Sequence, residues 1–203
     1  MSSQLNIFDA DDLHNSIKSL EGFKYQSQLI TDGQEQALLA KITSLPFREF
    51  EFHGYLGRRR VVSFGWRYEY SGGGKLQEAE APPDYLLELR ESAASFAQVK
   101  PETLHQALVT EYRPGAGIGW HRDKAVFGSV VGISLISDCV IRFRRSVGKS
   151  KRGDRARKTW QRVNVLAERC SAYLLSGPAR SVWEHSIAGV DQLRYSITFR
   201  NVV

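Results

Sequence analysis

The sequence predicts a mainly β fold, a double-sheet jelly roll with helices packed outside it. Three observations favour this class. After Pro101 the chain divides into eight short β-like runs, glycine and proline separate those runs, and two helical patterns precede them. Eight short strands at this spacing are typical of a jelly roll. The expected strands are 104–112, 117–121, 130–136, 139–145, 159–166, 171–175, 182–187 and 193–200.

The N-terminal part predicts a loose arm, two strands and a helix. Residues 1–22 show no clean period and are expected to form the arm. Residues 23–30 alternate as a strand does, and residues 47–52 alternate more weakly. Thr31 and Gln34 have the spacing of a capping box, so a helix should begin there. Its apolar positions are Leu38, Leu39, Ile42 and Leu45.

Residues 55–70 have an unusual composition, because arginines alternate with aromatic residues. A flexible turn at 71–74 closes this segment. Pro82-Pro83-Asp84 then introduces a second helix. One face of that helix carries Tyr85, Leu86, Leu89, Ala93 and Phe96.

Size and charge indicate one domain, residues 1–203, with its β core in 101–203. The net charge of +6 fits either a polyanionic partner or ordinary solubilising charge. Residues 144–158 carry eight basic residues against Asp154 and are expected to form a long charged loop. That loop is interpreted either as a contact for a nucleic-acid backbone or as an exposed hairpin tip.

Cysteine use and hydropathy predict a soluble, intracellular, cytoplasmic protein. Cys139 and Cys170 make no disulfide framework and suit a reducing compartment. The polar N-terminus lacks the features of a signal peptide, and no apolar run has the ~20 residues that span a bilayer.

His121, Asp123 and His185 form the ligand set of a 2-His-1-carboxylate triad. Residues i and i+2 of a strand face the same side, so His121 and Asp123 can address one ion. This set leaves three metal positions open and suits non-heme Fe(II), which must bind O2 and a co-substrate. A lone His-x-Asp is a weak signal, because a satisfied core histidine is the commoner explanation of it.

The alternating segment Arg194 to Arg200 strengthens the metal interpretation. Its polar face holds both arginines, and buried cations need anions. The two guanidinium groups could hold the carboxylates of one small diacid, so the sequence predicts an iron- and 2-oxoglutarate-dependent oxygenase. The alternative is that one arginine pairs structurally with Asp123 or Glu184.

Three motifs resemble those of the AlkB family of Fe(II)/2-oxoglutarate dioxygenases. The stretch from Leu108 to Asp123 resembles the family's metal signature, Trp183-Glu-His185-Ser its second metal motif, and 194–200 its terminal two-arginine motif. The resemblance implies a jelly-roll core, oxidative dealkylation of nucleic-acid bases, a substrate lid at 53–75, and iron bound by the triad.

The resemblance also implies roles for further residues. Arg194 and Ser196 would hold the distal carboxylate of 2-oxoglutarate, Arg200 would lie near the iron, and Tyr112 and Thr110 would contact the co-substrate. Trp66 would stack a flipped base, or could instead be core. The remaining expected substrate contacts are Tyr68, Tyr70, Arg58, Arg59, Arg60 and Trp120.

Two departures from the family pattern bear on the substrate. Thr110 stands where founding members carry Asn, and Ala125 stands where they carry an acid near the base. Demethylation of N-alkylated DNA bases in damage repair is the expected function, with RNA as a further substrate. The alternatives are the same chemistry on tRNA, other RNA or protein, and an inactive nucleic-acid-binding module. A monomer without membrane association is expected.

Overall fold

The computed structural model describes residues 19–52, 55–69, 74–152 and 155–203. The predicted arm up to residue 18, and Tyr70, lie outside the described residues. Within them, no helix is long and apolar enough to cross a membrane.

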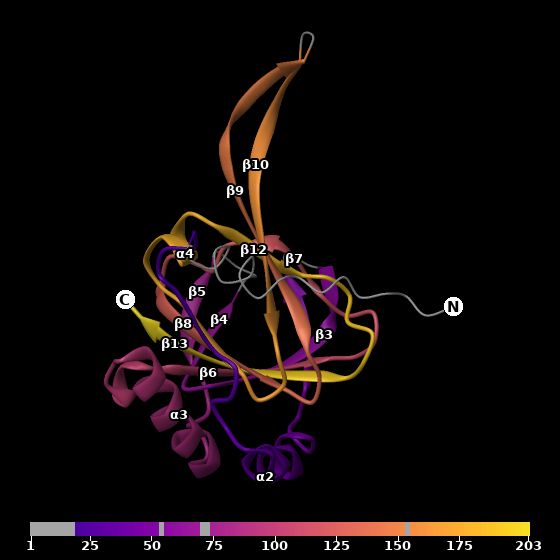
Figure 1. Ribbon diagram of the computed structural model, residues 1–203. Coiled ribbons are helices and arrows are strands. Elements are labelled where there is room, and N and C mark those ends of the chain that lie inside the picture. The colour runs from indigo at the N-terminus through magenta and orange to yellow at the C-terminus, as the bar shows by residue number, and fades with distance from the viewer. Residues whose placement is uncertain (1–18, 53–54, 70–73, 153–154) are drawn as a thin grey trace.

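Two antiparallel sheets form the body (Figure 1), and every strand predicted after residue 101 is confirmed. The seven-stranded sheet has the order β1-β11-β8-β13-β6-β3-β2, and the four-stranded sheet has the order β10-β9-β12-β7. The first sheet consists of β1 (Phe23–Gln26), β11 (Ala172–Leu175), β8 (Phe127–Leu135), β13 (Arg194–Val202), β6 (Gln106–Tyr112), β3 (Tyr55–Phe64) and β2 (Arg48–Phe52). The second consists of β10 (Arg155–Ala167), β9 (Cys139–Arg152), β12 (Glu184–Ile187) and β7 (Ile118–His121).

The helices cover the outer face of the seven-stranded sheet, as predicted (Figure 1). The predicted capping box is present at the start of α2 (Asp32–Ile42), where Thr31 and Gln34 bond reciprocally. Helix α3 (Asp84–Ala97) begins after Pro83. Both pack their apolar faces on sheet residues such as Val109 and Ile197. A 3-10 turn (Pro101–Thr103) and α4 (Gly177–Ser181) complete the helical structure.

Strands β6, β8 and β11 of the larger sheet contribute side chains to the apolar clusters on both of its faces. In β13, Tyr195, Ile197 and Phe199 face the helices, while the alternate residues face the second sheet. The space between the sheets is filled by a separate apolar cluster that includes Phe143, Val163 and Trp183. The polar inner face of β13 thus lies at the edge of a dry interior, where its charges need partners.

The charged segment 144–158 is not a loop, so that prediction was wrong. Strands β9 and β10 continue through it as a ladder, with Arg152 opposite Arg155, and the hairpin projects from the body (Figure 1). The loop was predicted from the density of like charges alone, because such runs are usually solvated, but charged side chains are also solvated on an exposed hairpin. Side chains at 149–157 lie outside the described residues.

A third, two-stranded sheet forms from β4 (Trp66–Glu69) and β5 (Lys75–Glu78) within the aromatic and basic segment. Gly65 turns the chain between β3 and β4 at φ +72°, a conformation that favours glycine. A Cβ there would also lie 2.1 Å from the carbonyl oxygen of His105. The turn directs β4 and β5, here called the ribbon, away from the main sheet.

Candidate metal and co-substrate site

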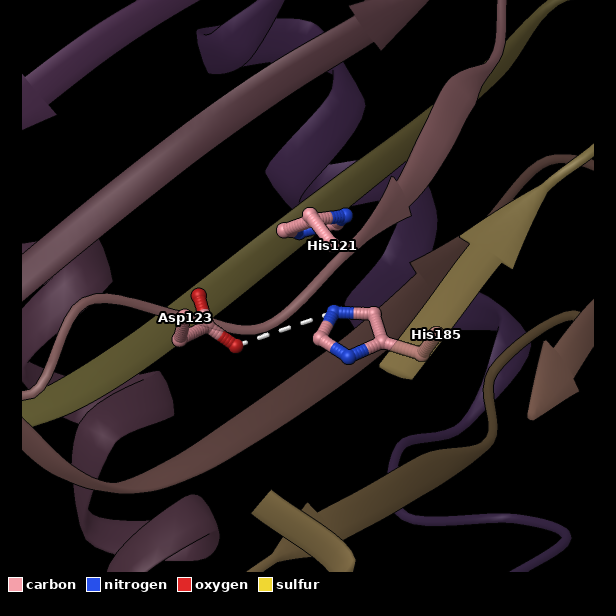
Figure 2. Close-up of side chains that lie close together, drawn as sticks. All are labelled: His121, Asp123 and His185. Carbon is pink, nitrogen blue, oxygen red and sulfur yellow. Dashed lines mark ion pairs between the residues drawn. The ribbon is translucent and has the colours of Figure 1, made fainter. Parts of the chain in front are cut away.

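The three predicted ligands converge between the two sheets (Figure 2). His121 ends β7, and His185 lies directly opposite it on β12. One ligand atom from each of His121, Asp123 and His185 lies within 4.8 Å of the others. Among the described residues, this is the one group of three or more histidines, cysteines and acids placed to hold a metal ion.

Asp123 reaches this point from a loop. The i, i+2 argument treated it as a strand residue beside His121, but β7 ends at His121, as the predicted strand 117–121 does, and Asp123 follows in the connection to β8. Its carboxylate lies 3.7 Å from Nε2 of His185 and 3.3 Å from Nη2 of Arg200. Arg200 therefore pairs with Asp123, which was one of the alternatives for the arginines.

The protonation states suit a divalent metal. Burial lowers the pKa of both imidazoles, that of His185 to about 4, so both are neutral at pH 7. Burial alone would raise the pKa of Asp123, but Arg200 and the two histidines outweigh it and the pKa falls. Nδ1 of His121 donates to the carbonyl oxygen of Gly119 at 2.9 Å, which leaves Nε2 to face an ion.

Arg194 is completely buried, which is unusual for a cationic side chain. Its Nε donates to Oγ of Ser134 at 3.0 Å, and its guanidinium lies 5.0 Å from the ring of Tyr112. Nη1 and Nη2 are buried without a hydrogen-bond partner. A buried cation with two orphaned donors requires an anion, so this site fits a carboxylate group of 2-oxoglutarate.

The other predicted co-substrate residues lie beside Arg194. Tyr112 is its register partner on β6, and Thr110 is the partner of Ser196. All of them are buried on the inner face of the sheet. The structure thus brings Thr110, Tyr112, Ser196 and Arg194 together, while their contacts with the co-substrate stay predictions.

Sequence reasoning missed two residues that orient the arginines. Ser134 holds Arg194, and Gln106 accepts a hydrogen bond from Nη1 of Arg200 at 3.0 Å. A signal for Ser134 existed, because a serine inside the apolar run of β8 faces the interior. Gln106 offered no such signal, since its role depends on its register with Arg200.

A cavity of about 450 Å³ adjoins the site, and Arg200 and Phe127 form part of its wall. The ribbon contributes Tyr68, whose ring lies 6.3 Å from that of Phe127 and 5.5 Å from Nζ of Lys124. Tyr68 lines the cavity, whereas Trp66 is not among its lining residues. The position therefore supports Tyr68 more than Trp66 as the aromatic residue that meets a substrate.

The predicted substrate arginines have different surroundings. Arg60 makes two hydrogen bonds of 2.8 Å to Glu111, so its guanidinium is engaged within the sheet. Arg59 lies over the ring of Phe50 at 3.8 Å, and Arg58 is exposed. Of the three arginines Arg58 is the exposed one, and its contact with a phosphate stays a prediction.

Trp120 points away from the ligands, because it precedes His121 on the strand. Its ring lies 4.3 Å from the guanidinium of Arg144. This position gives no support to a direct contact with a substrate in the cavity.

The sequence of this chain matches a protein-family model and is similar to several known proteins. The family model described as the 2OG-Fe(II) oxygenase superfamily matches residues 25–200. A Danio rerio protein named probable RNA/DNA demethylase ALKBH6 is 26% identical over 168 residues, which cover 82% of this chain and 69% of that protein. The Mus musculus tRNA (carboxymethyluridine(34)-5-O)-methyltransferase ALKBH8 is 24% identical, with 82% of this chain but 24% of that protein covered.

Solved structures show the same fold. OsALKBH1 has a TM-score of 0.58 at 14% identity, covering 89% of this chain and 98% of that one. A prolyl hydroxylase from Trichoplax adhaerens has a TM-score of 0.62 at 12% identity, covering 95% of this chain and 88% of that one. The jelly-roll prediction is therefore confirmed.

Proposed function

This chain belongs to the 2OG-Fe(II) oxygenase superfamily and to the AlkB family within it, and on that premise we propose that it removes N-methyl groups from nucleic-acid bases. As a member it is a dioxygenase that uses Fe(II), 2-oxoglutarate and O2. The observation that supports a base substrate is the cavity beside Arg200, which has Tyr68 and Phe127 in its wall. Its volume of about 450 Å³ is within the usual range for small-molecule sites.

Each group in the site has a separate task. His121, Asp123 and His185 would hold the iron, and Arg200 holds Asp123 in place from the second oxygen of its carboxylate. Arg194 would bind a carboxylate of 2-oxoglutarate with the two Nη atoms that have no other partner. When bound, iron and 2-oxoglutarate supply the oxidation of a methyl C–H bond by O2, with succinate and carbon dioxide as by-products. The hydroxymethylated base then releases formaldehyde.

The protein's own contribution is placement and the exclusion of water. Phe127, Phe143 and Tyr112 are buried around the ligands and co-substrate residues, so charges there act in a low dielectric. A base must leave its stack to reach this depth, which favours single-stranded or flipped substrates. Tyr68 of the proposed lid, residues 53–75, would face such a base, and Arg58 would meet its phosphates.

We propose methylated DNA, in damage repair, as the first candidate substrate and methylated RNA as the second. One relative is named for both nucleic acids and another for tRNA, so neither is favoured by similarity alone. The complete ligand set and the two Nη atoms of Arg194 that lack a hydrogen-bond partner give the inactive binding module no support. We also propose a monomer of one domain in a reducing, cytoplasmic compartment, which agrees with two free, buried cysteines.

The test is reconstitution with Fe(II) and 2-oxoglutarate without oxygen, followed by exposure to air with matched DNA and RNA oligonucleotides. Each oligonucleotide carries 1-methyladenine or 3-methylcytosine, and mass spectrometry follows the loss of one methylene mass per methyl group. His185→Ala is the inactive variant. His105→Ala is its matched control, because His105 is exposed and accepts a hydrogen bond from the Val202 amide.

Demethylation that requires His185 and 2-oxoglutarate would establish the proposal, and the DNA to RNA ratio would assign the substrate. Succinate production with every oligonucleotide unchanged would contradict base demethylation and direct the search to proteins. No succinate from the iron-loaded protein would leave only a binding role.

A further inference from the structure

One side chain from each strand of the four-stranded sheet meets on the sheet's outer face. Arg144 of β9 lies between the rings of Trp120 of β7 and Trp160 of β10, with its guanidinium 4.3 Å from each ring centroid. Its Nε donates to Oε2 of Glu184 of β12 at 2.7 Å. We call these four residues the brace. It spans the width of the sheet, β10-β9-β12-β7.

The brace lies directly behind the metal ligands. Trp120 immediately precedes His121, and Glu184 immediately precedes His185. Successive residues of a strand point to opposite faces, so each imidazole points inward where its preceding neighbour points outward. Any rotation of β7 or β12 about its axis would move the imidazole and the outer side chain together.

Backbone pairing alone fixes β7 poorly. It is a four-residue strand at the edge of the sheet, and within the described residues its ladder partner is β12 alone. The recorded pairs are His185 with His121 and Ile187 with Ile118, with an irregular register between them. Such short edge strands belong to the less stable parts of a fold. His121 thus sits on a segment that needs further support.

The brace supplies this support from the two longest strands. Contact between Trp120 and Arg144 passes over β12 and joins β7 to β9, which pairs with β10 along its length. Arg142 adds a second link, with its guanidinium 5.3 Å from the Trp120 ring and its Nε 3.1 Å from Oγ of Ser186. The side chains of Arg144 and Glu184 are only 24% and 25% exposed, so their pairing is shielded more than that of ordinary surface groups.

We propose that Trp120, Glu184, Arg144 and Trp160 are positioning residues that set the spacing of His121 and His185 for the iron. Only a planar guanidinium can stack between two indole rings while it donates in its plane to a carboxylate. The inference concerns iron binding by the family's ligand set and holds for any substrate.

The experiment measures Mn(II) binding, because Mn(II) is stable in air and takes the same nitrogen and oxygen ligands. The unsubstituted chain is compared with two variants. Arg144→Lys keeps the positive charge but loses the flat guanidinium. Trp160→Ala removes a ring from β10, which lies two strands from β12 in the sheet. Trp160→Phe restores an aromatic ring. Arg162→Lys is the matched control, since Arg162 is exposed on β10 opposite Arg144 in the ladder.

Arg144→Lys and Trp160→Ala are expected to weaken Mn(II) binding about tenfold, as loss of groups that orient ligands does. Amide exchange in β7 should accelerate in the same two variants, while exchange in β8 stays unchanged. Trp160→Phe and Arg162→Lys should bind Mn(II) within about a factor of two of the original chain.

Unchanged Mn(II) affinity in folded Arg144→Lys and Trp160→Ala would overturn the proposal, even if their unfolding free energy fell. If one variant does not fold, the other decides the result. Failure of both to fold would also overturn it, because the brace would then serve the stability of the whole sheet.

Discussion

The strand β13 and the ribbon of β4 and β5 both border the site, but they are fixed very differently. Strand β13 is paired on one side with β6 and on the other with β8, and Arg194 to Phe199 are all buried. In the ribbon β4 pairs with β5, and its side chains are only partly buried or exposed. We therefore expect co-substrate binding to depend on β13 and substrate choice to depend on the ribbon.

The largest effect on ligand binding should come from substitution of Arg194 on β13, which should change co-substrate binding but not the ribbon. Arg194→Met removes the cation that would bind 2-oxoglutarate and should weaken its affinity about 100-fold or more, as loss of a buried charge partner does. The metal-free protein should unfold at the same or a higher temperature, because an unpaired buried cation disappears.

Calorimetry of 2-oxoglutarate binding and thermal unfolding together check this prediction. Arg162→Met is the control, since it removes an exposed arginine from β10. A normal 2-oxoglutarate affinity in Arg194→Met would show that β13 does not carry the co-substrate site.

Substitution of Tyr68 should affect substrate binding, the role expected for the ribbon. Tyr68→Ala removes the aromatic ring that the ribbon places in the cavity wall. The KM for a methylated oligonucleotide should rise about tenfold, which corresponds to the loss of one stacked base. Affinity for 2-oxoglutarate should stay the same.

Steady-state kinetics of Tyr68→Ala and Tyr68→Phe provide the measurement, because the second variant keeps the ring. If Tyr68→Ala weakened 2-oxoglutarate binding as well, the ribbon and β13 would not be functionally separate.

Most residues of the candidate site could be predicted from the sequence, because burying them is unfavourable without a partner. Burial of a histidine or an arginine costs free energy, so such residues at alternating positions of apolar strands predict a functional site. This applies to His121, His185, Arg194 and Arg200. The end of the strand at His121 was predicted, but the path of the following connection, which brings Asp123 to the site, has no periodic signal in the sequence. Gln106 and the brace were missed because they depend on strand register, which a single sequence does not specify.

The hairpin of β9 and β10 should have a smaller effect on the reaction. Lys158 is exposed, with Nζ 5.5 Å from the ring of Trp160. If the hairpin meets phosphates, Lys158→Glu should weaken binding of single-stranded DNA a few-fold and make it less dependent on salt, by about 0.7 in the logarithmic slope for each lost phosphate contact.

Fluorescence anisotropy over a series of salt concentrations checks this, with the exposed Lys100→Glu as a charge-matched control near α3. Equal salt slopes for the two variants would identify the hairpin as a tip without a role in binding.

Glu111 should affect stability and leave the reaction unchanged, although it lies next to Tyr112. It faces away from the site, where it accepts hydrogen bonds from Arg60, Arg113 and Tyr195. Hydrogen bonds from Arg60 lower the pKa of Glu111 more than burial raises it. The folded protein therefore holds fewer protons than the unfolded chain as the pH falls past the ordinary carboxyl range, and stability declines there.

Glu111→Gln should remove this part of the pH dependence. Near neutral pH the variant should lose about 1–3 kcal/mol of unfolding free energy, because the arginines lose their carboxylate. The two proteins should become more alike in acid, where Glu111 is protonated and resembles glutamine. Denaturant unfolding over a pH series tests this, with exposed Glu49→Gln as control. Glu111 and Tyr112 are successive residues of β6 and face opposite sides of the sheet. Unchanged 2-oxoglutarate affinity in Glu111→Gln would therefore show that the stabilising face and the binding face of this strand act separately. A large change in that affinity would show that the two faces are coupled.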